Sequence, residues 1–160
     1  VNGIACGGGF EIVLGTDIIV MEEHARFALP EIHVAVLADA GTIKLRRRIP
    51  YHVAVEFLLT GRWMDAAEAK HWGLINEIVS ADQLMPRARA LAEQLAEGPP
   101  LVFAAIKEID RETSHLPVHE AFHMVTKRKL PTVDKLYSSE DQLEGARAFA
   151  EKRKPVWKGK

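Results

Sequence analysis

The chain has 160 residues, 48% of them hydrophobic, which is enough for an ordinary globular domain with its own core. Twenty-one Lys and Arg against 22 Asp and Glu leave a formal net charge of -1, which excludes the broad basic field that holds a nucleic acid. The single cysteine, Cys6, excludes an internal disulfide and favours a reducing, cytoplasmic setting. No apolar run is long enough to span a bilayer, so we expect no membrane partner.

The N-terminal stretch centres on three consecutive glycines, Gly7, Gly8 and Gly9, which follow a short apolar segment over residues 1–4. The apolar segment predicts a buried strand, and the residues after the glycines predict a helix over 10–16. Glycine is used where the backbone takes unusual angles or comes very close to another group. Free N–H groups at a helix start favour negative charge. Glu11 lies in the first turn of this helix. We therefore expect the glycine turn to be a site that binds a carbonyl oxygen on which negative charge develops.

A second acid, Glu31, directly follows Pro30 and two predicted strands over residues 18–21 and 25–28. The chain would leave Glu11 along the helix and return on the second strand, which would bring Glu31 back beside Glu11. In a hydratase, one carboxylate takes a proton from water while another delivers a proton to carbon, and two close carboxylates resist being ionised together. Two alternatives stay open: Glu11 as an acid that only favours the helix dipole, and Glu31 as a solvated turn residue.

The remainder of the chain is predicted to be mostly helical. Capping boxes, in which an N-cap residue and the residue three positions on exchange hydrogen bonds, begin helices at Asp65, Ser80 and Ser139. The expected elements are helices over residues 51–59, 65–72, 80–97, 101–111, 118–129 and 140–152, and a strand over 74–79. In the last helix, Leu143 and Phe149 are expected to face inward.

A zinc-binding pattern occurs in one of these helices. The run His119-Glu120-Ala121-Phe122-His123 matches H-E-x-x-H, in which two histidines bind zinc and Glu120 activates the bound water. Glu144 lies where a third ligand would be sought, so a metalloprotease is a remote alternative. Against it, Phe122 and Val125 are expected on the buried face of this helix. We therefore predict no metal site.

Five runs of residues form a wider pattern: residues 1–11, Phe27-Ala28-Leu29-Pro30-Glu31, Leu59-Thr60-Gly61-Arg62, Ala66-Ala67-Glu68-Ala69 with Trp72-Gly73-Leu74, and the run from Ser139 to Arg153. Together they resemble the crotonase (enoyl-CoA hydratase/isomerase) superfamily over nearly the whole chain. The closing run resembles the carnitinyl-CoA dehydratases and close enoyl-CoA hydratase relatives most. The resemblance implies an α/β fold, with residues 1–80 as the C-terminal part of a crotonase-type ββα spiral. Residues 81–160 would form a helical region that builds homotrimers, usually paired into hexamers.

The resemblance also implies an activity, that of a lyase of acyl-CoA metabolism. Water would add reversibly, in the syn sense, to a trans-2-enoyl-CoA thioester, and no cofactor would be needed because the substrate carries coenzyme A. By the family pattern, the Gly8 amide would bind the thioester oxygen, Glu11 and Glu31 would hold the water, and Phe149 and Lys152 would help bind CoA. Alternatives are an enoyl-CoA isomerase, which can run on one acid, and an inactive fragment that retains only oligomer contacts.

Two departures from the family pattern lead to further expectations. The family's first half, with the other oxyanion amide, would lie upstream of Val1, so we expect a complete parent to be active and this chain alone to be inactive. The segment Asp39-Ala40-Gly41-Thr42-Ile43-Lys44-Leu45 has one glycine fewer than the pattern. The helix that borders the acyl pocket would therefore begin in a shifted position.

Overall fold

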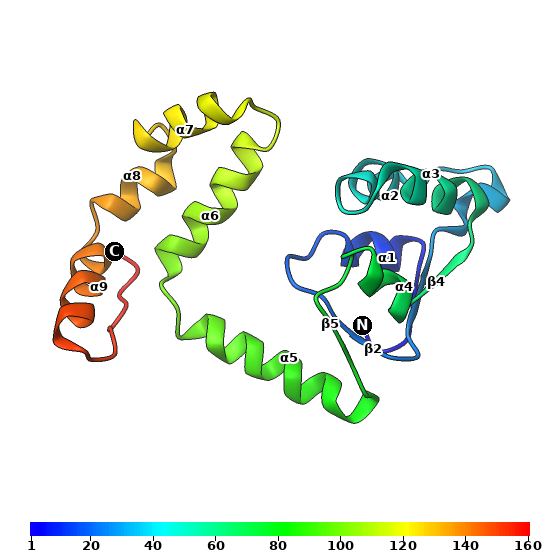
Figure 1. Cartoon of the computed structure of the whole chain (residues 1–160), viewed down its shortest axis with the longest axis horizontal. Coiled ribbons are helices and arrows are strands. Elements are labelled where there is room, and N and C mark those ends of the chain that lie inside the picture. Colours follow the sequence, from blue (N-terminus) through cyan, green and yellow to red (C-terminus); the bar gives the residue numbers. More distant parts are fainter. The chain divides into compact units, whose positions relative to one another are not determined.

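A three-stranded sheet positions the glycine turn. The structure, a computed structural model, describes all residues from 1 to 160 and divides into two compact units, Val1–Leu91 and Ala92–Lys160. The first unit contains β1 (Ile4–Cys6), α1 (Gly8–Val13), β2 (Val20–Glu22), β3 (Arg26–Ala28), η1 (Pro30–Val34), α2 (Asp39–Lys44), η2 (Leu45–Arg47), α3 (Tyr51–Thr60), β4 (Trp63–Asp65), α4 (Ala66–His71) and β5 (Glu77–Val79). The helix α5 (Ala81–Ala96) begins in the first unit and ends in the second. Figure 1 shows the strands confined to the first unit.

The sheet order is β1-β3-β4, and β2 pairs separately with β5. β1 and β3 run parallel with Cys6 opposite Ala28, whereas β3 and β4 run antiparallel. Because β1 and β3 are parallel and in register, the residues that follow them, Gly7 and Leu29, emerge at the same edge of the sheet. This is the physical reason why Glu31, two residues after Leu29, returns to the glycine turn.

The core of the first unit anchors the start of α1. Phe10 is fully buried and stacks on Phe27 of β3, with ring centroids 4.3 Å apart and an interplanar angle of 12°. Phe57 of α3 meets the Phe10 ring edge-on at 6.0 Å. Offset-stacked and edge-to-face rings are the favoured arrangements of buried aromatic side chains. Since Phe10 directly precedes Glu11, this cluster fixes the backbone that carries the first acid.

The second unit consists of helices and a C-terminal segment. Its helices are α6 (Pro100–Thr113), α7 (Val118–Thr126), α8 (Pro131–Tyr137) and α9 (Glu140–Glu151). A small apolar cluster of Ala105, Leu130 and Val133 lies between α6 and α8. After α9 the chain reverses, and residues 153–160, here called the C-terminal strap, run back beside that helix (Figure 1). No helix in either unit has the length and apolar character needed to cross a membrane.

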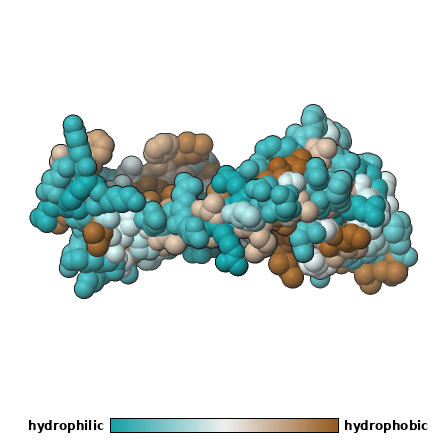
Figure 2. All heavy atoms as spheres, turned by 90° about the horizontal axis from the view of Figure 1, so that it is seen from below, coloured by the Kyte–Doolittle hydropathy of each residue, from teal (hydrophilic) through white to brown (hydrophobic).

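The helical second half and the mixed α/β first half are confirmed, but several details differ from the sequence-based expectations. The strand β4 was not predicted, because its alternation is only three residues long and merges with the cap of α4. Phe149 and Leu143 do not face inward: they are 88% and 55% exposed. Phe122 of α7 is 66% exposed, because α7 packs on α6 through Met124 and Val125 instead. Apolar residues are visible at the surface in Figure 2. The domain division at residue 80 remains a prediction.

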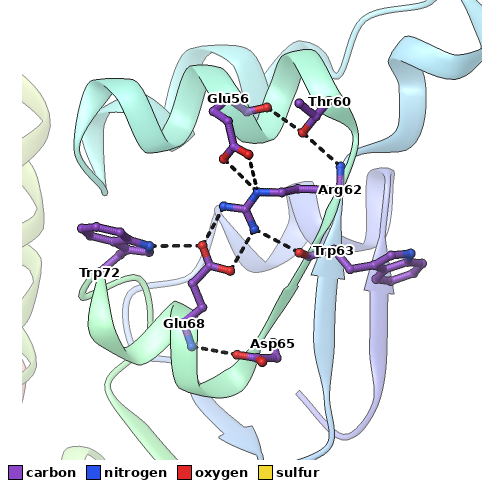
Figure 3. A network of polar contacts seen from close by, with 7 residues as sticks. All are labelled: Glu56, Thr60, Arg62, Trp63, Asp65, Glu68 and Trp72. Carbon is purple, nitrogen blue, oxygen red and sulfur yellow. Dashed lines mark hydrogen bonds and ion pairs between the residues drawn. The ribbon is translucent and has the colours of Figure 1, made fainter.

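An ion-pair network ties α3, β4 and α4 together (Figure 3). The Arg62 guanidinium donates to both oxygens of Glu68, at 2.6 and 2.8 Å, and to both oxygens of Glu56, at 2.8 and 2.9 Å. The Trp72 indole N–H donates to Glu68 as well, at 3.2 Å. The hydrogen bond from Arg62 lowers the pKa of Glu68, and its partners raise the pKa of Arg62. The network therefore holds the turn at Gly61 with three charged side chains.

We predict that Glu68→Gln destabilises the chain by about 1–3 kcal/mol near neutral pH, the range for hydrogen bonds to charged groups. The side chains of Arg62 and Glu68 are only 29% and 30% exposed, so solvent screens the pair incompletely. Because the folded-state pKa of Glu68 is lowered, its contribution is present above the ordinary carboxyl pKa of about 4.3 and is lost as the pH falls through the folded value. Urea titrations at a series of pH values from 7 to 2 measure the free energy of unfolding of the parent and the variant. The difference between these two free energies should become smaller as the pH falls. A difference that does not change with pH would contradict the stabilising role of ionised Glu68.

Candidate active site around the glycine turn

The glycine turn leaves two backbone N–H groups free. Gly7 has a φ of 55°, a left-handed conformation that glycine adopts without strain, and its N–H donates to the Ala28 carbonyl at 2.9 Å. The Gly7 carbonyl accepts from the N–H groups of Phe10 and Glu11 at 2.9 and 3.1 Å. The N–H groups of Gly8 and Gly9 donate to no acceptor in the chain, and a Cβ on either glycine would meet nothing within 4 Å. An oxyanion can therefore approach them.

Glu11 is held from a distant part of the chain. Its Oε1 accepts a hydrogen bond from the Gly41 N–H at 2.9 Å, across 30 residues of sequence. Gly41 lies in α2, where a Cβ would stand only 2.6 Å from a methyl group of Leu29. Only a glycine therefore lets α2 come this close to the end of β3. In the sequence, Gly41 stands out as the one glycine of the segment over residues 39–45. That its N–H binds Glu11 could not be deduced without the fold.

Glu31 also lies close to the glycine turn. It follows Pro30 in the first turn of η1, a short 3-10 helix. One carboxylate oxygen, Oε2, is buried and has no hydrogen-bond donor. The other, Oε1, lies so close to Gly7 that a Cβ on that glycine would be 2.8 Å away. The structure thus places Glu11 and Glu31 on the same glycine turn, as the return of the chain along β3 predicts.

The arrangement can support proton transfer next to a carbonyl group. Glu11 lies in the first turn of the helix that begins at the glycine turn, and Glu31 lies close to Gly7. The N–H groups of Gly8 and Gly9 have no acceptor in the chain. Backbone N–H groups that are already aimed at a developing oxyanion stabilise it without reorganisation. Glu11 has one oxygen fixed by Gly41, which leaves its second oxygen for a water molecule or a substrate. The individual roles of Gly8, Glu11 and Glu31 remain predictions.

The other two predicted site residues, Phe149 and Lys152, lie in the second unit. Phe149 is on the last turn of α9, and Lys152 is its C-cap residue with a left-handed φ of 54°. Both residues therefore lie at the C-terminal end of α9, Phe149 within the helix and Lys152 just beyond it. Phe149, at 88%, is the most exposed large apolar side chain of the chain.

The H-E-x-x-H residues do not assemble a metal centre. His119 and Glu120 are exposed on α7, and Glu144 is bound by the Arg153 guanidinium. Ligand atoms of three His, Cys, Asp or Glu side chains come together only at Glu22, Glu23 and His24, and no His from α7 is among them. The absence of a metal site therefore stays a prediction.

The family model for enoyl-CoA hydratase/isomerase matches residues 1–160, the entire chain. The chain belongs to the enoyl-CoA hydratase/isomerase family. It is 47% identical, over its full length, to the carnitinyl-CoA dehydratases of Citrobacter koseri and Salmonella typhi, and spans 62% of the length of each. This confirms the resemblance deduced from the five sequence runs.

Solved structures of this family carry the same fold. An enoyl-CoA hydratase from Bacillus anthracis superimposes with a TM-score of 0.91 at 34% identity, covering 99% of this chain and 60% of the hydratase. An enoyl-CoA hydratase/isomerase from Mycobacterium paratuberculosis gives a TM-score of 0.91 at 33% identity, covering 100% of this chain and 62% of that protein. The predicted crotonase-type fold is therefore confirmed. The chain spans about three fifths of the length of these relatives.

Proposed function

We propose that the complete protein, meaning this chain with whatever else its gene encodes, is a hydro-lyase acting on CoA thioesters. It would add water reversibly to a trans-2-enoyl-CoA, or remove water from a 3-hydroxyacyl-CoA such as carnitinyl-CoA. One observation supports this above all: Glu31 touches Gly7 of the same turn from which Glu11 begins its helix. A pair of carboxylates favours a hydratase or dehydratase over an isomerase, which can run on one.

The proposed reaction follows from the positions of these groups. The Gly8 N–H would donate to the thioester oxygen as negative charge grows on it in the enolate-like transition state. Glu11 would accept a proton from water while the water oxygen bonds to C3, and Glu31 would give its proton to C2. One molecule of water is added in total. Proton exchange with solvent then returns Glu11 to its ionised form and Glu31 to its protonated form.

The hydrogen bonds support this division of roles. The Gly41 N–H holds Oε1 of Glu11, which leaves the other oxygen of this carboxylate to accept a proton from water. The Oε2 atom of Glu31 faces no donor, so this oxygen can carry a proton without giving up a hydrogen bond. A protonated carboxyl at this position would be ready to act as the acid. Glu11 is therefore the proposed base and Glu31 the proposed acid.

The test is hydration of crotonyl-CoA by the complete protein, followed by loss of absorbance of the conjugated thioester. We expect turnover within the usual enzyme range of about 1–10³ per second. A parallel assay of the 160-residue chain alone tests whether it is inactive without further sequence. Isomerisation without hydration would favour the isomerase alternative. No turnover of any enoyl- or 3-hydroxyacyl-CoA by the complete protein would end the proposal.

The C-cap of α9 gives a second prediction, concerning CoA binding. Lys152→Ala and Lys152→Gly both remove the amine, and both should raise the KM for crotonyl-CoA if this amine contacts the nucleotide part of CoA. The two variants should differ in stability, since glycine relieves the left-handed backbone that alanine keeps, a difference of about 1 kcal/mol. Thermal unfolding together with KM measurements separates the effects. An unchanged KM in both variants would remove Lys152 from the CoA site.

A further inference from the structure

The C-terminal strap is fixed to α9 by two carboxylates one helical turn apart. Asp141, only 3% exposed, accepts hydrogen bonds from the backbone N–H groups of Lys158 and Gly159 at 2.7 and 2.9 Å. Glu144 accepts two bonds from the Arg153 guanidinium, at 2.6 and 2.9 Å, and one from the Val156 N–H at 2.9 Å. These bonds engage both ends of the strap. Charge-assisted and bidentate bonds are the strongest of their kind.

The ring of Trp157 adds an apolar contact to the strap. It lies against Gly145 of α9, where a Cβ would be 3.4 Å from the ring, an ordinary van der Waals contact. The indole N–H donates to the Glu97 carbonyl at 3.1 Å. Glu97 lies just beyond the end of α5, so the strap connects α9 to the turn before α6. Arg153 and the Val156 N–H also lower the pKa of Glu144 to about 2, which keeps this anchor ionised at any physiological pH.

The same contacts close the end of α9 on which Phe149 and Lys152 lie. The Arg153 N–H donates to the Ala148 carbonyl and the Lys152 N–H to the Phe149 carbonyl, the pattern by which a left-handed residue ends a helix. The neighbouring Arg153 side chain then binds back to Glu144, two turns earlier. Because Lys152 directly precedes Arg153, the anchoring of the strap sets the position of Lys152, whereas Phe149 is held by the helix itself.

We infer that Asp141 and Glu144 are positioning residues, which clamp the strap and so hold Lys152, at the C-cap of α9, in the position that receives CoA. The inference rests on the proposed CoA-binding role of Lys152. Side chains that are ordered before the ligand arrives do not lose conformational freedom on binding. Releasing the strap should therefore weaken CoA binding without changing the chemistry at the glycine turn.

The test uses Asp141→Asn and Glu144→Gln in the complete protein, which keep side-chain size but weaken the clamp. Glu120→Gln is the control, because Glu120 is an exposed acid of the same unit whose carboxylate approaches His119, at 3.8 Å, and not the strap. We expect KM for crotonyl-CoA to rise up to about tenfold in both clamp variants, the loss that corresponds to ordering one long side chain on binding. We expect kcat to change less than about twofold, and Glu120→Gln to match the parent.

Limited trypsin cleavage after Arg153, followed by mass spectrometry, reports independently on strap release. Cleavage should be about tenfold faster in the clamp variants, because local opening exposes this bond. Unchanged cleavage would overturn the clamp, and faster cleavage with unchanged KM would show that the strap is only structural. Lys152→Ala tests the CoA-binding role separately. If this variant leaves KM unchanged, Lys152 does not bind CoA, and the inference about the clamp is then also wrong.

Discussion

Replacing either acid at the glycine turn is expected to remove most of the hydration activity of the complete protein. Glu11→Gln and Glu31→Gln should each lower kcat by about 10²–10⁴-fold, because each removes a positioned proton-transfer group. Glutamine keeps the length of the side chain, so KM for crotonyl-CoA and the unfolding midpoint should change little. The double variant should lose less than the product of the two single losses, since groups that act as one unit are strongly non-additive.

The control for these variants is Glu23→Gln, an exposed acid of the same unit that pairs only with His24. It should keep the parental rate. An unaffected double variant would end the assignment of this site.

Local chemistry was the part of this fold that the sequence revealed best. The glycines, the acid after them and the proline before Glu31 are adjacent in sequence, so their turn and helix-start character follows from local rules. The N-cap at Asp65 appears as predicted, with its carboxylate accepting from the Glu68 N–H at 2.8 Å, but the Glu68 carboxylate binds Arg62 and Trp72 and does not complete the capping box. The return of Glu31 was also predictable, because parallel strands in register end at the same edge of a sheet.

Long-range contacts could not be predicted from the same rules. The hydrogen bond from Gly41 to Glu11 joins residues 30 positions apart, and nothing local indicates which glycine amide will meet which acid. The exposure of Phe149 was missed for a related reason. A helical apolar stripe predicts that a face is covered, but not whether the cover comes from the same chain. The strap depends on Asp141 and Glu144, which in the sequence look like ordinary first- and second-turn helix acids.

The close approach of Glu31 to Gly7 leads to a prediction about folding as well as activity. Gly7→Ala places a Cβ 2.8 Å from the Glu31 Oε1 atom and forces alanine into a left-handed φ of 55°. We expect a loss of about 1–3 kcal/mol in the free energy of unfolding, the range for such backbone strain. We also expect kcat of the complete protein to fall about 10²-fold, since a displacement of about 1 Å at a reacting group has that effect.

A double-mutant cycle separates the strain from the collision. Gly8→Ala is the control for stability, because its Cβ meets nothing within 4 Å and its backbone is not left-handed. Its unfolding midpoint should match that of the parent. In a Glu31→Ala background the collision partner is gone, so Gly7→Ala should destabilise the protein by less there than in the parent, by an interaction term of about 0.5–3 kcal/mol. Urea unfolding of the four proteins measures this term. An equal loss in both backgrounds would mean that Glu31 does not lie against the glycine turn in solution, and the proposed pairing of the two acids would then lose its main structural support.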